Sequence, residues 1–104
     1  MRTTLRLAAM GLLVGFAGTA VAAGDAATGE QLNQEKGCVG CHGETGVSVS
    51  PDAPNLAGQD AQALVDAMIA YTEGDHPLKK GLMSGLSEQE MADLAAFYAS
   101  QPSP

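Results

Sequence analysis

Cys38-Val39-Gly40-Cys41-His42 contains both cysteines of the 104-residue chain. Two thiols separated by two residues can each bond one of the two vinyl groups of a single porphyrin. The histidine that follows at once is then placed under the ring, where an imidazole nitrogen can ligate the iron. The C-x-x-C-H pattern therefore predicts covalent haem attachment through Cys38 and Cys41, with His42 as an iron ligand.

Three other uses of two closely spaced cysteines fit this sequence less well. A dithiol redox pair is typical of a βαβ pattern, and the sequence has no strand-like runs. A zinc site would need two further ligands, and His76 is the only histidine besides His42. A disulfide across two intervening residues has poor geometry. Covalent haem is therefore the interpretation that the cysteine spacing favours.

The first 22 residues have the pattern of a secretory signal peptide. Basic Arg2 and Arg6 precede an apolar run over 7–20, and small residues follow it. A membrane anchor is the alternative, but this run is short for a span and no second apolar segment follows. We expect cleavage after Ala22 or Ala23, export to the periplasm, and one domain over 23–104 without a membrane span.

The chain after residue 22 is strongly acidic. It contains all 12 acidic residues and only three of the five basic ones, which gives a formal net charge of −9. This charge disfavours nucleic acid and anionic lipid, and it could steer the protein toward a basic partner, although simple solubility explains it equally well. At this length an apolar core alone is marginal, so a buried porphyrin would add to it.

Local signals predict an all-α fold. Helices are expected over 25–36, 60–72 and 87–100, because each segment begins at a capping residue and the last two carry an apolar stripe. Met68 falls on the stripe of the second helix and is expected in the core rather than at a metal. The segments 43–53 and 76–86 are expected to form loops or turns.

The chain from residue 23 resembles the class I cytochromes c, and most closely one half of the dihaem cytochrome c4 group. GDAATGEQ, CVGCHG, PNLAGQ and LSEQEMADLAAFYASQ carry the resemblance, in this order. It implies a small fold of three to four helices wrapped around one covalently bound haem. It also implies that Gly29 crosses under the Phe97-Tyr98 pair, and that the Pro54 carbonyl orients the ring of His42.

The resemblance leaves the second axial ligand open. In this group a methionine stands at the position that Lys79 occupies when the register is counted back from Leu86, and Met83 follows one helical turn later. Met83 could ligate after a local shortening of the loop, or Lys79 could ligate as a neutral amine. A five-coordinate, open site is the third alternative.

The expected function is electron transfer in the periplasm, with a single haem c iron cycling between its ferrous and ferric states. We expect no enzymatic activity, and redox proteins with a basic docking surface as partners. A haem-based small-ligand binder or sensor is one alternative, and a haem subunit of a larger redox enzyme is another. The sequence does not specify an oligomeric state.

Overall fold

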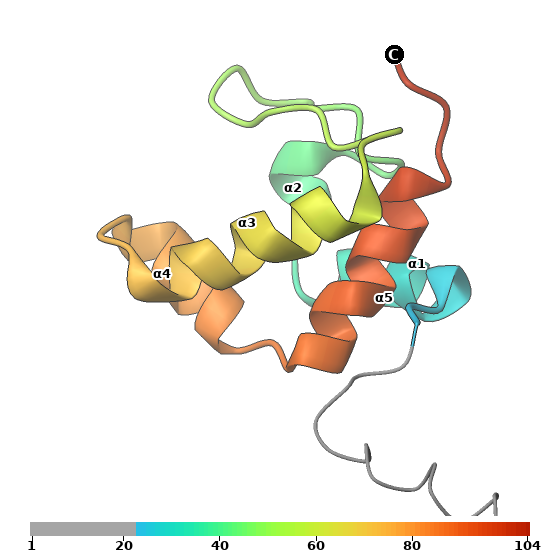
Figure 1. Ribbon diagram of the computed structural model, residues 1–104. Coiled ribbons are helices and arrows are strands. Elements are labelled where there is room, and N and C mark those ends of the chain that lie inside the picture. The colour runs from blue at the N-terminus through green and yellow to red at the C-terminus, as the bar shows by residue number, and fades with distance from the viewer. Residues whose placement is uncertain (1–22) are drawn as a thin grey trace, which may run out of the picture.

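The computed structural model describes residues 23–104, so the predicted signal peptide lies outside the described residues. Within this range the chain forms helices and no strand, which confirms the all-α prediction. The helices, shown in Figure 1, are α1 (Ala26–Glu35), α2 (Val39–His42), α3 (Ala61–Glu73), α4 (Pro77–Ser84) and α5 (Glu88–Ala99). None of the described helices is long and apolar enough to cross a membrane.

The described residues form five helices, whereas three to four were predicted. The single turn α2 is one addition, and α4 is the other, because the segment expected to be turn and loop is helical. Pro77 starts α4, where its missing N–H has no helical partner to lose. His76 caps this helix, since its Nδ1 accepts a hydrogen bond from the Lys79 N–H at 3.2 Å.

Hydrogen bonds from the capping residues confirm the predicted starts of three helices. The Asp25 carboxylate accepts from the Thr28 N–H at 3.0 Å, and Asp60 caps α3 in the same way. At α5 the Ser87 hydroxyl accepts from the Glu90 N–H at 3.0 Å, while the Glu90 carboxylate accepts from the Ser87 N–H at 2.9 Å. This reciprocal pair satisfies two backbone donors that a helix start leaves free.

Helices α1 and α5 cross in close contact, and Gly29 makes the crossing possible (Figure 1). A Cβ atom on Gly29 would lie 2.0 Å from the Asp93 carbonyl oxygen and 2.7 Å from the Phe97 Cβ. Any larger side chain would therefore push the helices apart. The expected position of Gly29 under Phe97 is confirmed, and Tyr98 has a separate role described below.

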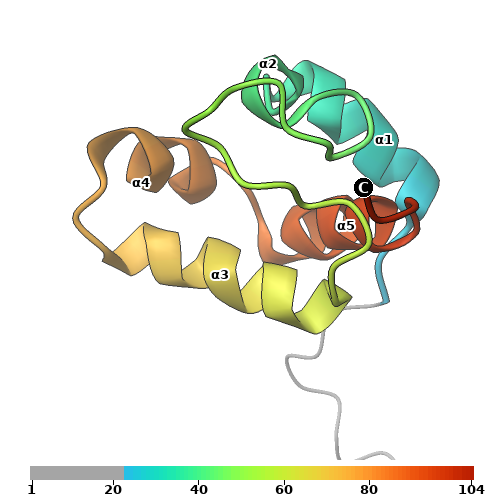
Figure 2. The ribbon, with the colours of Figure 1, turned by 90° about the horizontal axis from the view of Figure 1, so that it is seen from above.

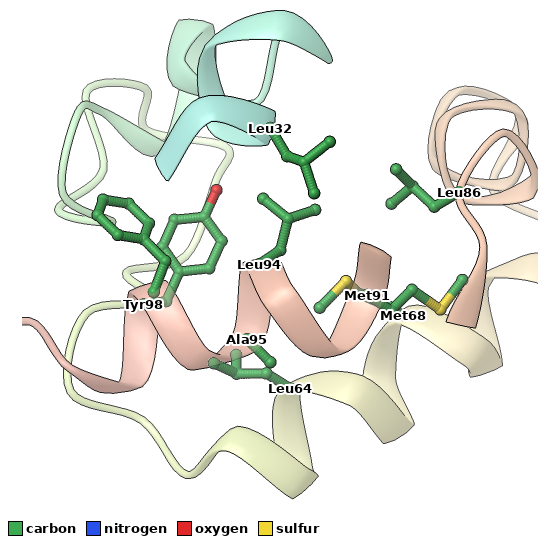
Figure 3. Close-up of a cluster of buried hydrophobic side chains, with 9 residues drawn as sticks. Leu32, Leu64, Met68, Leu86, Met91, Leu94, Ala95 and Tyr98 are labelled. Atoms are coloured by element: carbon green, nitrogen blue, oxygen red, sulfur yellow. The ribbon is translucent and has the colours of Figure 1, made fainter. Parts of the chain in front are cut away.

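The hydrophobic core lies where α1, α3 and α5 meet. In Figure 3, Leu32 of α1 faces Leu94 of α5, and Leu64 and Met68 approach from α3. Met68 is buried, which confirms its assignment to the core. The complete cluster comprises Leu32, Leu64, Met68, Leu86, Met91, Leu94, Ala95, Phe97 and Tyr98. This core forms one wall of the cavity described next.

Candidate haem site

Two adjoining cavities, of about 200 and 410 Å³, are lined by residues of α2 and its following loop and by residues of α3 and α4. Figure 2 shows how these helices and the loop are arranged. Four residues line both cavities, namely Cys38, His42, Lys79 and Met83. All four are residues for which the sequence predicted haem attachment or iron ligation. Side chains from segments far apart in the chain thus meet around one continuous space.

The inner and outer parts of this space differ in their walls. Leu56, Leu64 and Leu94 line the inner cavity, together with Met68. The outer cavity is bordered by Cys41 and by the α4 residues Leu78 and Leu82, which are 63% and 50% exposed. A large flat group could therefore be buried along most of its surface and still reach solvent at one edge.

His42 is held from behind by the backbone of the Pro54 segment. Its Nδ1 lies 3.0 Å from the Pro54 carbonyl oxygen. Because a carbonyl can only accept, Nδ1 must carry the proton, and the lone pair of the neutral ring is then on Nε2. No residue in the described range hydrogen-bonds that second nitrogen. The ring is thus oriented and left with one nitrogen available to a metal.

The Pro54 carbonyl is itself fixed by hydrogen bonds that cross the loop. The Ser48 N–H donates to the Asn55 side-chain oxygen at 2.6 Å, and the Leu56 N–H donates to the Gly46 carbonyl at 2.7 Å. Pro54 directly precedes Asn55 and Leu56, which make these two contacts. The loop therefore presents its carbonyl in one place, although it contains no helix or strand.

Burial sets the protonation states in the site. Burial lowers the pKa of His42 from its ordinary value, the positive charge of Lys79 acts in the same direction, and the hydrogen bond to Pro54 opposes both. A neutral imidazole is the form that binds a metal. Burial also raises the pKa of the Cys38 thiol. In this cavity both groups therefore favour their uncharged forms.

Asn33 and Tyr98 connect the haem-binding sequence to α1 and α5, a contact that was not predicted from the sequence. Asn33 is fully buried, and its amide donates to the carbonyls of Gly43 and Glu44 at 3.1 and 3.3 Å. The Tyr98 hydroxyl donates to the Asn33 side-chain oxygen at 2.5 Å. The only available signal was that Asn33 follows Gly29 by one helical turn. The network holds the chain immediately after His42.

On the opposite side of the cavity, α4 contributes Lys79 and Met83. Both side chains are partly buried, and they lie one turn apart on the same helix. The Lys79 Nζ is 3.4 Å from the Tyr71 hydroxyl and 4.7 Å from the centre of its ring. Met83 packs against the hydrophobic core. His76, the remaining histidine, borders the outer cavity as the cap of α4.

The residues of this site fit a covalently bound haem. Apolar side chains line the inner cavity, both thiols line the outer cavity, and His42 has a free ring nitrogen. No group of three or more His, Cys, Asp or Glu side chains among residues 23–104 could hold a bare metal ion. The donor set therefore suits a metal that brings its own ring of ligands.

Comparison with known proteins also indicates a haem protein. The family model described as Cytochrome c matches residues 26–101. Cytochrome c4 of Pseudomonas aeruginosa is 41% identical over 92 residues, covering 86% of this chain and 45% of that protein. Cytochrome c-554(548) of Halomonas halodenitrificans is 42% identical over 84 residues, covering 76% and 99%.

The fold comparison agrees with the sequence comparison. The crystal structure of reduced recombinant cytochrome c4 from Pseudomonas stutzeri superposes with a TM-score of 0.68 and 30% identity, covering 77% of this chain and 47% of that one. The chain thus spans about half the length of the cytochrome c4 relatives that it matches. Haem c, bonded through the two cysteines of a C-x-x-C-H sequence, is the cofactor. The chain belongs to the cytochrome c family, as a monohaem class I member that resembles one half of cytochrome c4.

Proposed function

We propose that this chain is a periplasmic electron carrier whose single haem c iron changes between ferrous and ferric without binding a substrate. The observation that carries the proposal is the set of residues shared by both cavities, Cys38, His42, Lys79 and Met83. They combine an attachment thiol, an oriented imidazole and two candidate ligands on the opposite side. Such a site can close both faces of the iron and leave only an edge of the ring to partners.

Each residue on the His42 side has a separate task in this proposal. Cys38 and Cys41 anchor the porphyrin, and His42 supplies the nitrogen ligand. The Pro54 carbonyl accepts a hydrogen bond from the Nδ1–H of His42, which fixes the ring and its tautomer before and after each electron transfer. The bound haem supplies the one-electron chemistry, whereas the protein sets its exposure and its surroundings. Little has to move when the charge changes, because the loop and the Asn33 network hold this side.

The surface supports a partner with basic side chains around its own redox centre. The net charge of residues 23–104 is −9, and Leu78 and Leu82 form an exposed apolar border at the outer cavity. Opposite charges would speed the encounter, and apolar contact would bring the two redox centres close. The rate of electron transfer to a basic partner should therefore fall as the salt concentration rises.

A carbon monoxide experiment tests the proposed function against a ligand-binding or sensing role. A carrier whose iron is closed on both faces should bind carbon monoxide slowly or not at all when reduced, and should exchange electrons rapidly with small redox mediators. Rapid binding of carbon monoxide by the reduced holoprotein would favour the sensor. Copurification with a larger redox protein from periplasm at low salt would instead favour a subunit role.

The periplasmic location rests on residues 1–22 and has its own test. Their basic start and apolar run favour export, and export would place haem attachment and electron transfer in the same compartment. N-terminal sequencing of the protein purified from cells should begin at Ala23 or Gly24. A mature protein that retains the apolar run would indicate a membrane anchor instead.

A further inference from the structure

Helix α4 presents two different candidate ligands to the same cavity. Lys79 and Met83 are one turn apart, partly buried, and common to the linings of both cavities. His42 lines the same two cavities from the other side. If His42 ligates the iron, as proposed above, only one of these two side chains can be the ligand opposite it. The environments of the two side chains distinguish them.

Met83 is already used by the core. It is one of the partly buried hydrophobic residues that pack against the cluster containing Leu86 and Met68. Its position near the end of α4, just before Leu86, suits this packing. Met83 also lines both cavities, but bonding its thioether to the iron would loosen its contacts with these apolar neighbours, and close-packed interiors tolerate the resulting gaps poorly.

Lys79 differs from Met83, because its side-chain nitrogen contacts Tyr71 and pairs with no carboxylate among residues 23–104, although this range carries 12 acidic residues. Its partners are the hydroxyl and the ring of Tyr71. It also lies in the first turn of α4, where the helix dipole disfavours a positive charge. Lys79 is therefore a partly buried side chain without a carboxylate partner, and it lines both cavities together with His42.

We propose that the amine of Lys79, and not the thioether of Met83, is the iron ligand opposite His42. To bind, the ammonium group releases one proton to solvent, and the nitrogen lone pair forms the bond to iron; no electron is transferred in this step. Two N–H bonds remain on the amine. The Tyr71 oxygen, 3.4 Å from Nζ, can accept one of them and so orient the lone pair. Met83 stays in the core.

Spectra of the holoprotein test this assignment. The wild type should show a low-spin, six-coordinate ferric iron without the far-red band that methionine ligation produces. Met83→Leu, which conserves volume, should leave the spectrum unchanged. Lys79→Ala should lose the six-coordinate spectrum or change its ligand, and Lys79→Met should gain the far-red band and a higher midpoint potential, since methionine ligation raises the potential.

Two results would overturn the assignment. One is a far-red methionine band in the wild type that disappears in Met83→Leu. The other is a Lys79→Ala spectrum that cannot be distinguished from that of the wild type. A pyridine haemochrome assay on every variant separates this outcome from failure of the proposed function. Intact covalent haem with a methionine band refutes Lys79 alone, whereas a mature protein without covalent haem refutes the carrier itself.

Discussion

Replacing Gly29 by alanine tests the close crossing of α1 and α5. The new Cβ would lie 2.0 Å from the Asp93 carbonyl oxygen, whereas Cβ atoms essentially never come closer than 3.0 Å to another heavy atom. The two backbones must therefore separate by about 1 Å. Because the obstacle is backbone rather than a flexible side chain, it cannot simply rotate away. The substitution should act on the core as well as on the crossing itself.

The expected change in the free energy of unfolding is the difference between two opposing effects of Gly29→Ala. Overpacking costs about 1–3 kcal/mol, and a backbone obstacle places Gly29→Ala at the upper end of that range. Alanine regains about 1 kcal/mol of helix propensity over glycine. The net loss in the free energy of unfolding should be about 2 kcal/mol, or about 8–16 °C in Tm for a domain of this size.

Urea unfolding of the mature holoprotein, followed by far-ultraviolet circular dichroism, measures this loss. Gly81→Ala is the matched control, because a Cβ on Gly81 meets nothing within 4 Å and this residue lies in α4. The control should gain up to about 1 kcal/mol. If Gly29→Ala were as stable as the wild type or the control, the close-approach reasoning would be wrong.

Three further substitutions test one hydrogen bond beside the site and the caps of two helices. Tyr98→Phe leaves the oxygen of buried Asn33 without its donor and should lower the free energy of unfolding by about 1–3 kcal/mol; an unchanged urea midpoint would contradict this. Ser87→Ala should cost about 1 kcal/mol through the lost cap of α5, and a Tm equal to that of the wild type would refute it. The side-chain and backbone hydrogen bonds from Thr28 hold the pKa of Asp25 below its ordinary value of 3.8, so its stabilising effect is present above the unfolded pKa and lost as pH falls through the folded one. Asp25→Asn keeps the cap but cannot titrate, so its Tm should fall less steeply than that of the wild type as the pH is lowered. Equal slopes of Tm against pH would contradict the lowered pKa of Asp25.

Helix positions could be predicted from the sequence where local chemistry determines them. Asp25, Asp60 and Ser87 each supply an oxygen to the backbone of the turn that follows, and the structure has all three caps. The crossing at Gly29 followed from the resemblance rather than from the local sequence. A glycine inside a helix shows that something approaches closely, but it does not identify the partner.

Helix α4 and the contact between Asn33 and Tyr98 could not be predicted from local sequence. Pro77 and Gly81 are typical of a turn, yet Pro77 takes the first position of α4 and His76 caps it. The local sequence around Asn33 is typical of a surface position on a helix, because its hydrogen-bond partner Tyr98 lies 65 residues further along the chain. Only the fold brings these groups together, so no local pattern could reveal them.

A spectroelectrochemical titration of the mature holoprotein tests whether this chain is an electron carrier with a closed iron site. We expect one fully reversible one-electron transition, with the iron low-spin and six-coordinate in both oxidation states. His42, held by Pro54, and a ligand from α4 would then close both faces throughout the cycle. A high-spin iron in either state, or a reductive curve that does not retrace the oxidative one, would contradict the claim that this chain is an electron carrier.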